Sequence, residues 1–179
     1  MIIILLILLI IFYYSTVQEK FENKNIHTIQ INNLYINYSD NPYSGQKYNG
    51  ILKKNKKQNF IFTKIDNYYQ ISPVDKPHLL FAIRTNNGIP QFNQYTSFIN
   101  KNNLNMKNPI HRNRYRSALW NITRVGKKNY YLINNKRFPN MFIYNSDKTF
   151  FNLKCKVDGI VKFSNHPKKK TYWKITPKI

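Results

Sequence analysis

The chain has 179 residues, of which 16% are aromatic, and it carries 29 lysines and arginines against 7 aspartates and glutamates, a formal net charge of +22. The aromatic content excludes an intrinsically disordered chain, and the length suffices for one domain with a buried core. With only 5 glycines, glycine-rich nucleotide-binding loops are not expected, whereas the charge predicts attraction to polyanions such as sulfated glycans, anionic lipid headgroups or nucleic acid.

The N-terminal segment MIIILLILLIIFYYSTV (residues 1–17) is predicted to be a membrane anchor. A helix over residues 2–17 would be about 24 Å long, near the lower limit for a membrane span. A cleaved signal peptide is the alternative, but no basic residue precedes the apolar run and Tyr13 and Ser15 make a poor cleavage site. We expect a retained anchor, a linker over residues 18–24 and a membrane location. The side of the membrane is left open, although sequons at Asn37 and Asn121 would suit export.

Residues 25–179 show the alternation of apolar and polar side chains that is typical of short β-strands. In chain order the segments are IHTIQI (26–31), LYINY (34–38), FIFTKI (60–65), LWNITRV (119–125), IVKF (160–163) and YWKIT (172–176). Turn-forming Asn, Asp, Gly, Pro and Lys residues separate them, and no window keeps the helical period of 3.6 residues. The patterns predict an all-β domain.

Two segments of this domain repeat each other. NYYQISPVDKPHLLFAI (67–83) and NYYLINNKRFPNMFIY (129–144) share a tyrosine pair, an isoleucine, a proline and an apolar run at identical spacing. When the strand before each pair is aligned with the C-terminal WKITPK, Phe60, Trp120 and Trp173 become equivalent. We therefore predict three repeats, over approximately residues 25–66, 67–125 and 126–179, with these three aromatic side chains buried in one core.

Three units of about four strands, each with an aromatic residue in its last strand, resemble a β-trefoil, in which three units close around a pseudo-three-fold axis. Ricin-type lectins of that fold place a glutamine two residues before the core aromatic. Gln58 stands there before Phe60, but Ala118 and Thr171 occupy the other two places, which argues against a lectin's sugar pockets. The second unit contains an insertion within residues 91–116. A β-sandwich with two similar hairpins is the alternative fold.

A basic cluster precedes the last strand of each predicted unit. If equivalent loops lie on one side of a three-fold fold, the clusters form one basic face, a candidate site for an anionic partner. Tyr115 interleaves with the arginines, as contact residues do. The alternative is that these side chains only solvate the surface. The candidate residues are Lys53, Lys54, Lys56, Lys57, Arg112, Arg114, Tyr115, Arg116, Lys168, Lys169 and Lys170.

The titratable residues form no catalytic or metal-binding pattern. The aspartates beyond residue 25 are single and mostly lie beside turns, and the four histidines show no HxH, HExxH or Cys–His spacing. Cys155 is the one cysteine, so an internal disulfide is excluded and the residue is interpreted as a small apolar strand residue. We expect no enzyme, no cofactor and no metal.

The layout of the chain resembles a group of viral envelope proteins. The segments MIIILLILLIIFYY, NPYSGQKYNGIL and SALWNITRV, with a β domain rich in Asn, Ile, Lys and Tyr, are similar to the per os infectivity factors of large insect DNA viruses, most nearly the fourth. The resemblance implies a virion envelope protein that acts with other envelope proteins in a complex mediating oral infection of insect gut cells. It brings no catalytic residues with it.

These observations predict a membrane-anchored, non-enzymatic binding protein, and a role in a viral entry complex is the first hypothesis. The second is a module that binds a glycan or heparin-like polyanion. The third is an anchored nucleic-acid-binding protein, for which no RNP, KH or helix-turn-helix pattern is present.

Overall fold

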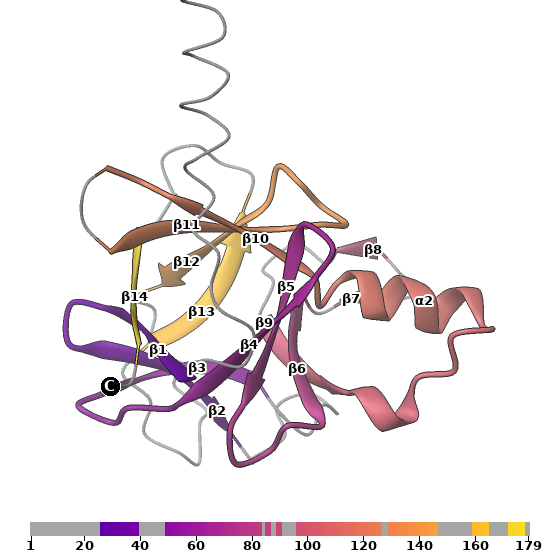
Figure 1. Ribbon diagram of the computed structural model, residues 1–179, viewed down its shortest axis with the longest axis horizontal. Coiled ribbons are helices and arrows are strands. Elements are labelled where there is room, and N and C mark those ends of the chain that lie inside the picture. The colour runs from indigo at the N-terminus through magenta and orange to yellow at the C-terminus, as the bar shows by residue number, and fades with distance from the viewer. Residues whose placement is uncertain are drawn as a thin grey trace, which may run out of the picture.

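The computed structural model describes residues 26–39, 49–83, 85–86, 89–90, 96–126, 129–146, 159–164 and 172–177. The predicted anchor and linker, Cys155 and the third basic cluster lie outside these residues. Within them, none of the helices has both the length and the apolar character needed to span a membrane. The described part is sheet-rich with one short α-helix, which confirms the predicted all-β class (Figure 1).

The segments predicted from alternation fall on strands. The strands are β1 (Ile26–Ile31), β2 (Leu34–Ser39), β3 (Asn49–Lys54), β4 (Phe60–Ile65), β5 (Tyr68–Pro73), β6 (Leu79–Ile83), β7 (Thr85–Asn86), β8 (Ile89–Pro90), β9 (Thr96–Asn100), β10 (Trp120–Arg124), β11 (Tyr130–Asn135), β12 (Phe142–Ser146), β13 (Gly159–Ser164) and β14 (Trp173–Pro177). The helices are the 3₁₀ helix η1 (Lys101–Asn103) and α2 (Pro109–Arg116).

Six strands pair into a closed ring. The antiparallel pairings run β10–β5–β4–β1–β14–β11, and β11 pairs back with β10. Because successive side chains of a strand point to opposite faces, each strand sends every second residue inward. Most of the inward residues are apolar or aromatic and form a single buried cluster with residues of the other strands, whereas His27 and Asn135 are buried polar residues outside it. A closed ring has no unpaired edge strand.

Three hairpins, β2–β3, β6–β9 and β12–β13, complete the main sheet, and β3 joins them by pairing with both β9 and β13. Two tryptophans bind the hairpins to the ring. The indole N–H of Trp120 donates to the Phe81 carbonyl at 2.8 Å, and that of Trp173 donates to the Ile143 carbonyl at 3.2 Å. Phe81 and Ile143 occupy the same place in the two repeated segments, so the repeated sequence produces a repeated contact.

Phe60, Trp120 and Trp173 each begin a ring strand, are fully buried and belong to the same core cluster, as the alignment predicted. Their antiparallel partners are His27, Tyr69 and Tyr131, respectively.

The tyrosine pair of the repeat has a structural reason. The second tyrosine, Tyr69 or Tyr131, is buried opposite the tryptophan of its own unit. The first, Tyr68 or Tyr130, lies on the outer side of the same strand, where Tyr130 is 40% exposed. Because side chains alternate along a strand, the second tyrosine of each pair points into the core and the first points away from it.

His27 occupies the position of the buried tyrosine in the first unit, edge-on to Phe62 at a centroid distance of 4.9 Å. Burial lowers the pKa of His27 below its usual 6.5, because desolvation disfavours the charged imidazolium. The unfolded chain therefore takes up the proton first as the pH falls below 6.5, and stability is lost through the folded pKa. We expect the free energy of unfolding, measured in urea, to fall from pH 7 to pH 5, and we expect His27→Phe to reduce this fall. An equal decline in that variant would contradict the assignment.

The insertion predicted in the second unit consists of η1 and α2. Residues 55–59 connect β3 to β4, whereas residues 101–119 connect β9 to β10. The α2 helix was not predicted, because it buries none of its residues and so leaves no apolar period of 3.6 residues. Its signals are local: the Asn108 side chain accepts the Ile110 N–H at 2.8 Å, and Pro109 begins the helix.

Candidate anion-binding surface

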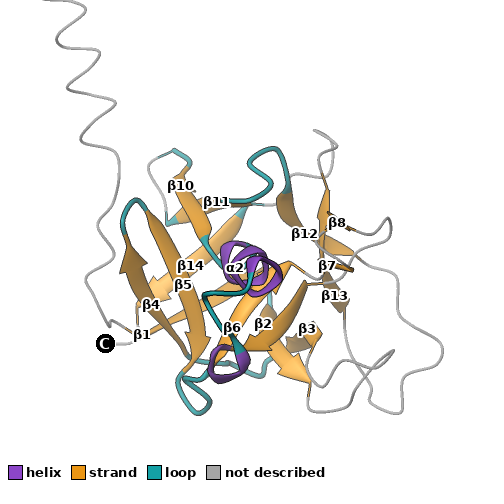
Figure 2. Cartoon of the chain, turned by 90° about the vertical axis from the view of Figure 1, so that its right-hand side faces the viewer, coloured by secondary structure: helices purple, strands orange, loops and turns teal. Residues whose placement is uncertain are grey.

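The connection between β9 and β10 carries a dense set of exposed cations. We call residues 101–119 the basic insertion. Figure 1 shows α2 projecting from the strands at one end of the longest axis, and Figure 2 looks onto that end. The sequence contains no aspartate or glutamate between residues 76 and 146, so no carboxylate of this long segment offsets the charge. The exposed cations of the insertion are Lys101, Lys107, Arg112, Arg114 and Arg116.

The basic insertion is held against the β-sheet by apolar packing. Tyr115, predicted to be a contact residue, instead packs against a small buried cluster of Leu80, Ala82 and Ala118. This side chain therefore fixes α2 to the β6 strand. The arginines on either side of it, Arg114 and Arg116, remain exposed.

A buried asparagine holds the end of the insertion. Asn135 of β11 is fully buried, and its amide nitrogen donates to the carbonyls of Ser117 and Leu119 at 2.9 and 3.2 Å. Its side-chain oxygen accepts the Arg137 backbone N–H at 3.0 Å. Three hydrogen bonds from one buried side chain thus fix the helix end relative to the loop after β11.

That loop adds a further cation, Arg137. Its guanidinium donates to the Asn113 carbonyl of α2 at 3.3 Å and lies 5.0 Å from the centroid of the Phe138 ring. Burial and the positive charge of Arg116 lower the pKa of Arg137. Two guanidinium groups near a helix C-terminus repel each other, and a bound anion would offset that repulsion.

Sequence reasoning missed Arg137 because it lies in a different unit from the arginines of α2. The repeat alignment does contain a signal. Arg137 stands where the preceding copy has Asp75, a carboxylate that accepts hydrogen bonds from Tyr38 and Gln58. A reversal of charge at an equivalent position indicates a different role.

The first basic cluster lies elsewhere. Lys53 and Lys54 end β3, and Lys56 and Lys57 are exposed in the turn before β4. Hydrogen bonds from Asn55 N to the Asn33 carbonyl and from the Asn37 amide to the Lys56 carbonyl hold this turn against β1 and β2. In Figure 1 it lies on the left and α2 on the right. The structure does not bring these two clusters together, and Lys168, Lys169 and Lys170 lie outside the described residues.

The two sequon asparagines differ in accessibility. Asn37 is 2% exposed, and its amide nitrogen donates to the carbonyls of Tyr35 and Lys56 at 3.0 and 2.9 Å. Asn121 is half-buried on the outer side of β10. No group of three or more His, Cys, Asp or Glu side chains that could hold a metal ion occurs among the residues that the structure describes.

No family model and no curated protein matches the sequence, but solved structures share its fold. A Caenorhabditis elegans protein of unknown function matches with a TM-score of 0.64 and 12% identity, over 89% of this chain and 97% of that one. A Culex quinquefasciatus salivary protein of the Cysteine and Tryptophan-Rich family matches with a TM-score of 0.58 and 17% identity, over 85% and 92%. The lysenin pore matches with 0.57 and 12%, over 87% of this chain and 47% of that one. At these identities the likeness establishes the fold alone.

Proposed function

We propose that residues 25–179 form a β-trefoil of three units, approximately 25–66, 67–125 and 126–179. The closed ring of six strands and the three hairpins support this arrangement, since each proposed unit supplies two ring strands and one hairpin. The pairs His27–Phe60, Tyr69–Trp120 and Tyr131–Trp173 recur once per unit. A sandwich of two open sheets would not close a ring between β10 and β11.

The domain is a non-enzymatic binding module, and its partner is a polyanion bound at the basic insertion. One observation carries this proposal: exposed cations of residues 101–119 surround a helix whose segment of the sequence lacks any carboxylate. Charges gathered in this way raise the local potential and attract anionic groups. Arg137, held against the end of α2, extends the same charged surface.

A sulfated glycan fits this surface better than nucleic acid does. Binding of single-stranded nucleic acid uses aromatic side chains on which bases stack. The basic insertion has two aromatic rings: that of Tyr115 packs against the body, and the His111 Nδ1 accepts the Asn105 N–H at 2.9 Å within the insertion. The insertion therefore offers charge and hydrogen-bond donors, which suit sulfate groups.

The resemblance to per os infectivity factors suggests where this binding takes place. An apolar segment at residues 1–17 would anchor the domain in a virion envelope, beside partner envelope proteins, and its basic insertion would contact acidic glycans at the surface of the host cell. The membrane location and the viral role are part of this proposal.

The proposal is tested by titrating the full chain with a heparin-derived oligosaccharide, its desulfated form and single-stranded DNA of equal charge at physiological salt. We expect saturable binding of the sulfated form, none of the desulfated form and weaker binding of DNA. The logarithm of affinity should fall linearly with the logarithm of salt concentration. DNA that binds as tightly as the sulfated sugar would favour the nucleic-acid hypothesis, and no saturable binding would mean that the lysines and arginines only solvate the surface.

A further inference from the structure

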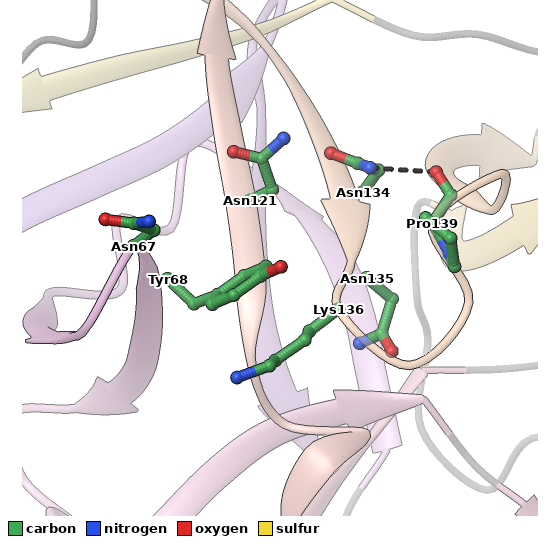
Figure 3. A pocket seen from close by; sticks show the side chains of 7 residues that line it. All are labelled: Asn67, Tyr68, Asn121, Asn134, Asn135, Lys136 and Pro139. Carbon is green, nitrogen blue, oxygen red and sulfur yellow. Dashed lines mark hydrogen bonds between the residues drawn. The ribbon is translucent and has the colours of Figure 1, made fainter.

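A polar cavity of about 240 Å³ lies on the outer side of the ring, where β5, β10 and β11 meet. Its residues come from two of the proposed units: Asn121 and Asn134 are cross-strand partners of β10 and β11, and the β5–β10 pairing brings Tyr68 beside them. Figure 3 shows amide side chains on one side of an aromatic ring and an ammonium group on the other. The lining residues are Asn67, Tyr68, Asn121, Asn134, Asn135, Lys136 and Pro139.

Two of the amides are held in place by the protein. Asn135 uses its side chain to bind the end of the basic insertion, so it forms a fixed part of the wall. The Asn134 amide nitrogen donates to the Pro139 carbonyl at 2.8 Å, and its oxygen is directed toward Asn121 in Figure 3. The cavity is therefore built on three strands and on a loop that this hydrogen bond holds in place.

Tyr68 supplies an aromatic surface. The Lys136 ammonium lies 4.3 Å from the ring centroid, so this ammonium group covers one face of the ring. Asn121 and Asn134 lie on the side of the other face (Figure 3). A ligand in the cavity would contact that second face and the amides together.

This set of groups selects for a hydroxyl-rich ring. A side-chain amide both donates and accepts hydrogen bonds, as a hydroxyl group does, and an aromatic face packs against carbon-bound hydrogens. The lining contains no carboxylate for a cation, and its one charge, on Lys136, lies behind the tyrosine ring. The volume equals that of about eight water molecules, which is the scale of a single sugar ring.

We infer that this cavity binds one neutral pyranose residue. The inference does not depend on the basic insertion, because the recognising groups are uncharged. Two sources could supply the sugar: a glycan of another molecule, or a glycan attached to Asn121 itself, which lies in the Asn-Ile-Thr sequon and lines the cavity.

The binding test uses the full chain made in bacteria, which attach no such glycan, kept in a detergent without a sugar headgroup. Methyl glycosides of glucose, galactose, mannose and N-acetylglucosamine are titrated by calorimetry. We expect at least one to bind with a dissociation constant in the millimolar range, unaffected by high salt. Asn121→Ala and Asn134→Ala should each weaken it at least tenfold, and the exposed Asn102→Ala of η1 should leave it unchanged.

Absence of binding by all four glycosides, or wild-type binding in both cavity variants, would overturn the inference. The source of the sugar is then identified with protein secreted from eukaryotic cells, which can attach a glycan to Asn121. If a glycan on Asn121 fills the cavity, the wild type should bind no added glycoside and Thr123→Ala should bind it. If the sugar comes from another molecule, both proteins should bind it. Thr123 is exposed and does not line the cavity, but its hydroxyl accepts a hydrogen bond from the Asn121 amide at 3.4 Å. The same variant made in bacteria is therefore the control, and it should bind the glycosides as the wild type does.

Discussion

Trp120→Ala should lower the free energy of unfolding by about 3–5 kcal/mol, the largest stability loss that we expect from one substitution. The side chain is fully buried and stacks on Phe81 at a centroid distance of 5.1 Å. Its removal leaves a cavity and also deprives the buried Phe81 carbonyl of the indole N–H that reaches it at 2.8 Å. Urea unfolding measured by circular dichroism gives the value, with the slope of the transition as a check on two-state behaviour.

Two further variants make this result specific. Trp173→Ala should cost a similar amount, because Trp173 makes the equivalent bond to Ile143 in the third unit. Tyr172→Ala, one residue earlier and 50% exposed, should change stability by about 0.5 kcal/mol or less. A loss below about 1 kcal/mol for Trp120→Ala would contradict the role of this side chain in joining the ring to the β6–β9 hairpin.

The strands with alternating side chains were predictable because each keeps one face in the core, whereas β6 is buried along its whole length. Alternation marked β1, β2, β4, β10, β13 and β14, and the spacing of the tyrosine pairs marked β5 and β11. The same spacing identified Phe60, Trp120 and Trp173 as residues of one core, since a repeated fold needs a large side chain at each equivalent place.

Other features left no periodic signal. The α2 helix buries no residue, so only its N-cap and proline mark it in the sequence. The insertion also places Arg112, Arg114 and Arg116 on a helix rather than on a short turn like the one after β3, which separates the two basic clusters. The cavity depends on the β5–β10 pairing, which brings Asn67 and Tyr68 beside Asn121 and Asn134 of the β10–β11 hairpin from a distant place in the chain.

Reversal of two charges on α2 should cause the largest loss of polyanion binding. Arg112 and Arg116 are four residues apart on the helix, so they share a face, and both are exposed. If each makes one charge-assisted contact worth about 1.5 kcal/mol, Arg112→Glu with Arg116→Glu should weaken binding roughly 100-fold. The slope of affinity against salt should also fall. Exposed helix positions tolerate this change, so circular dichroism should remain that of the wild type.

A binding surface on the basic insertion is tested most sharply by comparing this double variant with the double variant Lys56→Glu and Lys57→Glu, which alters the net charge equally at the exposed turn after β3. Charges act over a Debye length of about 8 Å at physiological salt, so a distant pair contributes little to a ligand on α2. Affinity for the heparin-derived oligosaccharide is measured in both variants at physiological salt. We expect a roughly 100-fold loss for the α2 pair and less than about threefold for the lysine pair. Equal losses in the two variants would show general charge attraction and contradict a binding surface on the basic insertion.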